Sequence, residues 1–145
     1  MKRRFIVNPV SGSGNARILF NQLQDSLLGR FGKIDTAITR KAGDATRLAR
    51  EALHAGIEQL IVIGGDGTVN EVVCGFFDQN QPINPKACLL VSDCGTGNDY
   101  YRHVFGSNAS AWLDSMEDFK PVKVDLGRVE ISSENPTLRL FINMM

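Results

Sequence analysis

The sequence predicts an α/β fold in which a parallel sheet carries helices on both faces. Short apolar runs typical of strands alternate with longer segments whose apolar residues recur at helical spacing. Glycine-rich turns at 8–14, 64–68 and 94–99 each join such a strand to such a helix. Because alternating strands and helices build parallel sheets, we expect residues 1–118 to form one α/β domain.

The chain opens with a predicted strand, "RRFIVNP" at 3–9, which Asn8 and Pro9 end. The turn "SGSGN" follows, and a helix is expected between Ala16 and Leu28. We expect this helix to cover one face of the sheet. Its apolar residues at helical spacing are Leu19, Phe20, Leu23, Leu27 and Leu28.

The second unit repeats the arrangement, with a predicted strand "IDTAIT" at 34–39. Asp44 is a candidate N-terminal cap for the next helix, and Gly56 is placed to end that helix. Its apolar stripe consists of Ala45, Leu48, Ala49, Ala52 and Leu53.

The third unit begins with "QLIVI" at 59–63, a continuous apolar run typical of a strand buried on both faces. A helix is expected after Gly67, and a proline-punctuated loop at 78–85 follows it. A fourth strand is predicted at 87–92, before a glycine turn that opens another short helix. The stripe of the third helix is Val69, Val72, Val73 and Phe76.

The pattern changes from about Lys120. The segments "PVKVDLGRVEI" and "TLRLFIN" are predicted as two strands with a turn and no helix between them. We therefore expect residues 119–145 to be the first strands of a truncated β domain, cut from a longer protein. Strands of such a fragment would expose unpaired edges, which favour self-association. We expect a homo-oligomer on this ground.

The composition excludes several classes of protein. Sixteen basic residues balance sixteen acidic ones, so no overall field favours nucleic acid. The three cysteines are odd in number and lack metal-site spacing, which indicates a reducing, cytoplasmic compartment. No apolar run approaches the length of about 20 residues that spans a membrane. Any contact with lipid would therefore be peripheral, at the inner face of the membrane.

The three glycine turns predict a phosphate ligand. Turns that follow parallel strands gather at the carboxyl edge of the sheet, where α/β folds bind ligands. Each turn also opens a helix, whose free N–H groups favour an anion. Common nucleotide motifs do not fit, because no P-loop pattern is present and the third glycine of G-x-G-x-x-G fails after Gly12 and Gly14.

Asp66 lies between glycines in the second turn, and two interpretations stay open for it. It could organise Mg²⁺ near the phosphates, or it could close a tight turn on its own backbone. Thr68 and Glu71 match a helix capping box, which could coexist with ligand binding. Asp99 and Asp125 are weaker signals, since each taken alone is better explained by an ordinary role: Asp99 as an acid at a helix start, and Asp125 as a polar residue on a strand face.

The motifs "NPVSG", "GGDGTVNEVV", "GTGNDYYR" and "VDLGRV", in this order, resemble the diacylglycerol kinase catalytic domain family. That family includes bacterial lipid kinases and sphingosine kinases, and it is related to the NAD kinases through G-G-D-G. The resemblance implies a Rossmann-like three-layer αβα sandwich followed by a β-sandwich domain, with the active-site cleft between them. It also implies transfer of the γ-phosphate of ATP to a lipid hydroxyl, with Mg²⁺.

The resemblance also implies roles for individual residues. An acidic network linked to Mg²⁺ through water would comprise Asp66, Asp99 and Asp125. The positions that match ATP-binding positions of the family are Asn8, Pro9, Val10, Ser11, Gly12, Thr39, Gly65, Asp66, Gly67, Thr68, Val69, Asn70, Glu71 and Thr96.

The chain departs from the family pattern in two respects. Asp93 stands where the family usually has a proline, two residues before Gly95. The catalytic base of the family belongs to the C-terminal domain, so we expect no catalytic residue within these 145 residues. The leading interpretation is the ATP-binding N-terminal part of a lipid kinase, inactive alone. The alternatives are an NAD kinase-like enzyme and a non-catalytic nucleotide-binding module.

Overall fold

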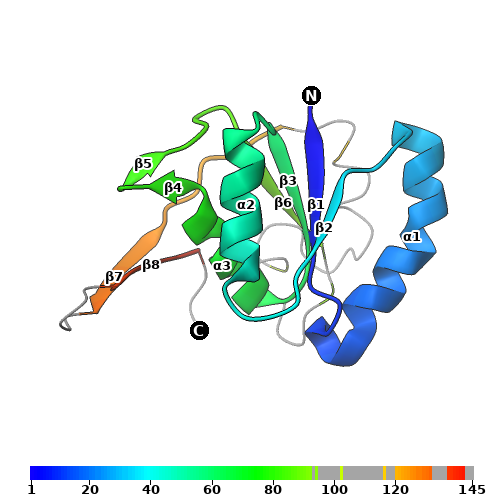
Figure 1. The fold of residues 1–145 in the computed structure, drawn as a ribbon, viewed down its shortest axis with the longest axis horizontal. Helices are drawn as coiled ribbons and strands as arrows, with labels where there is room; N and C mark the ends of the chain where they lie inside the picture. The colour runs from blue at the N-terminus through cyan, green and yellow to red at the C-terminus, as the bar shows by residue number, and fades with distance from the viewer. Residues whose placement is uncertain (93, 95–101, 103–115, 117–119, 132–136, 143–145) are drawn as a thin grey trace.

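A parallel sheet forms the centre of the molecule (Figure 1). The structure is a computed structural model that describes residues 1–92, 94, 102, 116, 120–131 and 137–142. Within these residues the sheet has the strand order β2-β1-β3-β6, and all three strand pairs are parallel. The strands are β1 (Arg3–Val7), β2 (Thr36–Ile38), β3 (Gln59–Ile63) and β6 (Cys88–Val91).

The central strand β3 confirms the prediction for its continuous apolar run. Every residue of β3 is buried, because a neighbouring strand lies on each side and helices cover both faces. Its register with β1 runs from Arg3↔Gln59 to Val7↔Ile63. Successive side chains of a strand point to opposite faces, so the residues of β3 supply both halves of the core.

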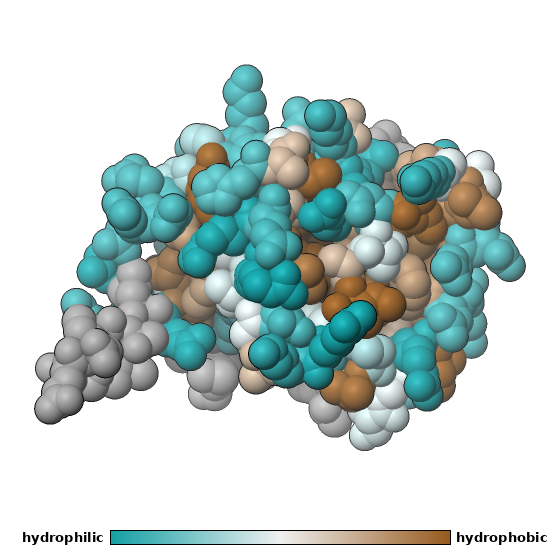
Figure 2. All heavy atoms as spheres, in the orientation of Figure 1, coloured by the Kyte–Doolittle hydropathy of each residue, from teal (hydrophilic) through white to brown (hydrophobic). Residues whose placement is uncertain are grey.

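Three helices complete the layers, and they confirm the predicted three-layer αβα arrangement. They are α1 (Asn15–Phe31), α2 (Asp44–His54) and α3 (Asp66–Gly75). On one face, α1 packs through Phe20 and Leu27 onto Phe5 and Ile61. On the other, α2 and α3 share a cluster of buried side chains with Val62. Figure 2 shows mainly hydrophilic side chains on the outward face of α2, as expected for an amphipathic helix.

The sequence predicted the C-terminal end of α2 correctly and its N-terminal cap wrongly. Gly56, with φ of +79°, follows the helix, and the N–H of Gly56 donates to the Leu53 carbonyl at 3.1 Å. This confirms the predicted glycine ending. The prediction that Asp44 caps the helix was wrong, because the cap position is Gly43 and no side chain bonds there. The Asp44 carboxylate instead accepts N–H groups that precede the helix.

Short elements occupy the connections. A 3₁₀ turn, η1 (Ser11–Gly14), lies between β1 and α1. The predicted loop after α3 contains a small antiparallel hairpin of β4 (Phe77–Asp78) and β5 (Gln81–Pro82). Gln79 and Asn80 between these strands both have positive φ. Such a pair of residues forms the tight turn that suits a two-residue hairpin loop.

The C-terminal strands pair with each other, which corrects the expectation of free edges only where these two strands meet. Strands β7 (Gly127–Ile131) and β8 (Thr137–Phe141) form an antiparallel hairpin. Strand β7 is shorter than the predicted segment "PVKVDLGRVEI", since it begins at Gly127. Beyond β8, Ile142 packs against the cluster shared by α2 and α3. A division at residue 118 stays a prediction.

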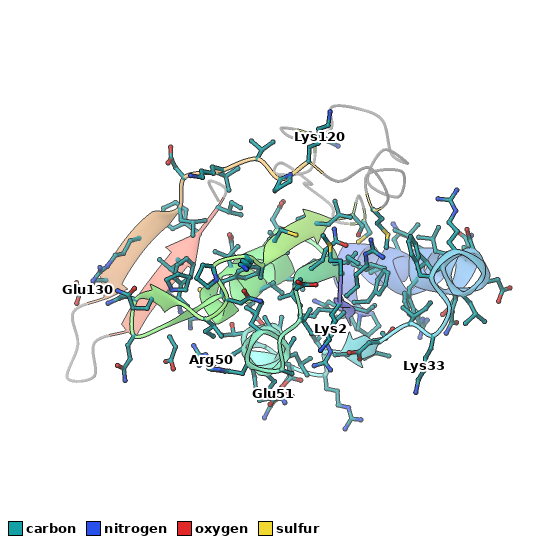
Figure 3. The ribbon with its side chains drawn as sticks, turned by 90° about the horizontal axis from the view of Figure 1, so that it is seen from above. Lys2, Lys33, Arg50, Glu51, Lys120 and Glu130 are labelled. Atoms are coloured by element: carbon teal, nitrogen blue, oxygen red, sulfur yellow. The ribbon has the colours of Figure 1, made fainter. Side chains whose placement is uncertain are left out.

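The layers are also visible from the end of the molecule (Figure 3). In this view α2, with Arg50 and Glu51, lies on one side of the sheet, and Lys120 lies on the other. Among the helices of the described residues, none is long and apolar enough to cross a membrane.

Candidate functional site

A pocket of about 380 Å³ lies at the carboxyl edge of the sheet, the lower edge in Figure 1. It lies over β1 and β3, where the chain order along the sheet reverses direction. Open α/β sheets bind ligands at such a switch point. The pocket is lined by Asn8, Val10, Ser11, Thr39, Arg40, Lys41, Ala42, Ala45, Gly65, Gly67, Thr68 and Glu71.

Asn8 joins the end of β1 to the first turn of α3. Its backbone N–H donates to the Ile63 carbonyl at 2.9 Å, and its Nδ2 donates to Thr68 Oγ1 at 2.9 Å. Gly64 allows this approach, since a Cβ there would lie 2.7 Å from the Cβ of Thr68. The first two glycine turns are therefore held together by a side-chain bond between residues 60 positions apart.

The turns also meet through Ser11 and Gly12. The N–H of Gly65 donates to Ser11 Oγ at 3.2 Å. Gly12 has φ of +58°, and a Cβ on it would collide with the carbonyl oxygen of Cys94. Gly12 and Gly65 thus share one edge of the sheet, as predicted. Cys94, at the start of the third turn, touches the first, whereas Gly97 lies outside the described residues.

The connection from β2 to α2 adds two cations that the sequence analysis missed. Thr39, a predicted site residue, is buried, and its N–H donates to the Val7 carbonyl at 2.9 Å. Arg40 and Lys41 follow it and line the pocket. The signal was present, because two basic residues come directly after a predicted strand, at the edge where the phosphate was expected.

Asp44 holds this connection in place. Its Oδ2 accepts the backbone N–H of Arg40 at 2.8 Å and that of Lys41 at 3.2 Å. Its Oδ1 lies 3.5 Å from the Arg47 guanidinium. The bond from Arg40, with those from Lys41 and Arg47, keeps the pKa of the Asp44 carboxyl below its ordinary value, although burial acts in the opposite direction. The ionised carboxylate therefore shapes one wall of the pocket.

Asp44→Asn should lose stability near neutral pH and little in acid. A carboxyl whose pKa is lower in the folded state stabilises that state above its unfolded pKa of about 3.9. This stabilisation is lost as the pH falls through the lower folded value. Urea unfolding of wild type and variant should show a difference near pH 7 that shrinks near pH 3. The control is Asp25→Asn on the exposed face of α1. A difference for Asp44→Asn that is equal at both pH values would contradict the assignment.

Thr68 and Glu71 do not form the capping box that their spacing suggested. The cap position of α3 is Gly65, so Thr68 lies within the helix. Glu71 Oε2 accepts the N–H of Ala45, at the start of α2, at 3.2 Å. The Thr46 hydroxyl also donates to the Glu71 carbonyl at 2.8 Å. Glu71 therefore joins the beginning of α2 to α3, beside the pocket.

The other predicted residues are distributed less tightly. Asp66 is the first residue of α3 and is half-buried, between the pocket-lining Gly65 and Gly67. Pro9 and Gly12 lie in the turn beside the pocket lining. Val69 is part of the core. Asn70 contacts the backbone that follows β8.

The acidic network is only partly described. Asp125 is exposed in the segment that precedes β7. Asp93, Thr96 and Asp99 lie outside the described residues. Among the residues that the structure describes, no three His, Cys, Asp or Glu side chains gather as a metal site. The roles of Asp66, Asp99 and Asp125 stay predictions.

Comparison with known proteins identifies the family. Residues 2–129 match the model of the diacylglycerol kinase catalytic domain. The chain belongs to this family. The resemblance noted from the glycine motifs is thereby confirmed.

Relatives of the family share sequence over almost the entire chain. A diacylglycerol kinase from Staphylococcus carnosus is 36% identical over 99% of this chain and 44% of its own length. One from Staphylococcus aureus strain Newman is 37% identical over 99% of this chain and 42% of its own. The chain spans less than half the length of these relatives.

A solved structure shares the fold. The crystal structure of a diacylglycerol kinase from Bacillus anthracis strain Sterne matches with a TM-score of 0.69 and 27% sequence identity. The match covers 86% of this chain and 41% of the other. The αβα arrangement is therefore the arrangement found in a solved family member.

Proposed function

We propose that this chain is the ATP-binding part of a lipid kinase that transfers the ATP γ-phosphate to a diacylglycerol-like hydroxyl. The observation that carries the proposal is the pocket at the carboxyl edge, where two helices begin and two cations gather. Family membership supports the kinase assignment over an NAD kinase-like enzyme or a non-catalytic nucleotide-binding module. The volume of about 380 Å³ suits a small-molecule ligand.

The start of each helix supports an anionic ligand. Helices α2 and α3 both begin at the pocket, and Ala45 and Gly67 in their first turns line it. The helix dipole favours negative charge at such ends. In α2 the N–H of Ala45 is already bonded to the Glu71 carboxylate, so the start of α3 gives the stronger support. Gly67 has open space where a Cβ would be, so a phosphate could approach the backbone there.

Charge in the pocket supports the same ligand. Arg40 and Lys41 are the cationic side chains of the lining residues, and Glu71 is the anionic one, so the cations exceed the anion by one charge. An ATP polyphosphate carries several negative charges, which these two side chains would offset in part. The Thr68 hydroxyl accepts from Asn8 and retains one hydrogen that it can donate to a ligand.

Mg²⁺ fits the chemistry of the acidic residues in this proposal. Asp66 lies at the start of α3, and carboxylates, often through water, are ligands that Mg²⁺ prefers. We propose that Asp66, Asp99 and Asp125 bind the ion indirectly, through hydrogen bonds to its water ligands. When bound, the ion would neutralise charge that develops on the transferred phosphoryl group.

In this proposal the lipid-binding site and the catalytic base lie outside these 145 residues. Relatives are more than twice as long, so we propose that the lipid contacts and the catalytic base lie in a region beyond these residues. Peripheral contact with a membrane, a cytoplasmic location and homo-oligomerisation belong to the same proposal. Transfer is expected only from the longer protein.

The first test is ATP binding, and Lys41→Glu should weaken it about tenfold, the effect of about 1.4 kcal/mol. The reversed charge would repel the polyphosphate from the pocket wall. Isothermal titration with ATP and with AMP measures both the affinity and its dependence on the phosphates. AMP should bind more weakly than ATP to the wild type and should be less sensitive to the substitution.

The matched control is Lys33→Glu, which makes the same change in net charge away from the pocket lining. Equal losses in the two variants would show that overall charge, and not the pocket, governs affinity. No ATP binding at all by the wild-type chain would contradict the proposed function.

A further inference from the structure

Strand β8 lies against α3, and two side chains of the helix bond to the backbone of Leu140 within the strand and of Ile142 just after it. Asn70 Oδ1 accepts the N–H of Ile142 at 3.1 Å. Cys74 Sγ accepts the N–H of Leu140 at 3.4 Å, and the thiol donates to the Leu140 carbonyl at 3.2 Å. The two contacts join segments that are 72 and 66 residues apart in the sequence.

The distance between Asn70 and Cys74 along the helix is close to the distance between Leu140 and Ile142 along the chain. Asn70 and Cys74 are one helical turn apart, a rise of about 6 Å. Leu140 and Ile142 are two strand positions apart, a distance of about 7 Å. Both pairs can therefore form together. If β8 shifted by one residue, the residues beside Asn70 and Cys74 would have N–H and C=O groups that point away from α3.

The contacts use the edge of β8 that does not face β7. Backbone groups of successive residues in a strand point to opposite edges, so those of Leu140 and Ile142 share one edge. The partner strand lies along the other edge, where Val129 pairs with Arg139 and Gly127 with Phe141. Helix α3 thus covers backbone groups that would otherwise be open to pairing with another chain.

The same helix connects two parts of the molecule. Its first turn lines the pocket through Gly67 and Thr68, and its body holds β8 through Asn70 and Cys74. Beside these bonds, Ile142 packs against the core cluster that includes Val69 and Val72. The helix that lines the pocket therefore also fixes the position of the β7–β8 hairpin.

We propose that Asn70 and Cys74 form a two-point clamp that sets the register of β8 on α3 and positions the β7–β8 hairpin relative to the pocket. Asn70 is then a positioning residue, whose side-chain oxygen serves the protein backbone. Its Nδ2 is buried and has no partner among the described residues, so the oxygen makes the bond that defines the role. The contacts themselves do not depend on the proposed function.

Hydrogen exchange of the 145-residue chain tests the clamp without any nucleotide. The amides of Leu140 and Ile142 should be protected in the wild type. Asn70→Ala should speed exchange of the Ile142 amide about tenfold, and Cys74→Ala should do so for Leu140 by a smaller factor, as a thiol is the weaker acceptor. Asn70→Asp, which keeps an acceptor oxygen, should retain protection of Ile142 within about twofold.

The internal reference is the amide of Ile61 in the centre of the sheet, which should stay protected in every variant. A matched control is Asn21→Ala, an identical change on the exposed face of α1, which should leave Ile142 unaffected. Unprotected Leu140 and Ile142 amides in the wild type would overturn the clamp. Unchanged exchange of Ile142 in Asn70→Ala would do the same. If Asn70→Ala fails to fold, Cys74→Ala at Leu140 decides the question alone.

Discussion

Asp66→Ala, made in the longer kinase that we propose, is expected to lower phosphate transfer about 100-fold, the usual cost of removing a group that stabilises transition-state charge. The variant would lack the carboxylate that we propose holds Mg²⁺ beside the phosphates. The fold should remain cooperative, because Asp66 lies at the helix start and outside the core. Transfer of labelled γ-phosphate from ATP to diacylglycerol, measured at saturating Mg²⁺, gives the answer.

Two companion measurements separate this role from a structural one. Asp25→Ala removes a carboxylate from the exposed face of α1 and should leave transfer within about twofold of the wild type. In the 145-residue chain, Mg²⁺ should strengthen ATP binding by the wild type and have little effect on Asp66→Ala. Undiminished turnover by Asp66→Ala would contradict the Mg²⁺ role and would mean that Asp66 is only an acidic residue at the start of a helix.

Gly75→Val should destabilise the chain by about 3 kcal/mol, because α2 and α3 touch at this glycine. A Cβ at Gly75 would lie 2.6 Å from both the Ala49 Cβ and the Thr46 carbonyl oxygen. The helices would have to move apart, and the bond between Glu71 and the start of α2 lies one turn away. The free energy of unfolding in urea measures the loss.

Gly29→Val is the matched control for this substitution. Gly29 lies in α1, and a Cβ there would have no neighbour within 4 Å. Its effect should stay within about 0.5 kcal/mol of the wild type. Equal effects of the two substitutions would mean that glycine at position 75 is a matter of helix propensity and not of helix contact.

The elements of the α/β unit could be predicted from the sequence because their signals are local. The continuous apolar run at 59–63 lies within β3, and the stripe from Val69 to Val73 lies within α3. The meeting of the first two glycine turns also followed, since a general rule places the carboxyl ends of parallel strands at one edge. Arg40 and Lys41 could have been included by the same rule.

What a polar side chain bonds to was decided by the tertiary structure. Thr68 and Glu71 have the spacing of a capping box, but Glu71 reaches Ala45, 26 residues away in the sequence. The spacing of local residues carries no information about a second helix that approaches closely enough to offer an N–H group. That approach depends on Gly75, whose missing side chain lets α2 and α3 touch.

The sequence by itself therefore determined the order and type of the four strands of the parallel sheet and of helices α1 to α3, the edge at which the first two glycine turns meet, and the family motifs. Only the tertiary structure decided that Asp44 shapes the pocket wall, and that Asn70 and Cys74 hold β8. The physical reason is that hydrophobic periodicity repeats within an element, whereas a single hydrogen bond depends on two backbones brought within about 3 Å by packing elsewhere.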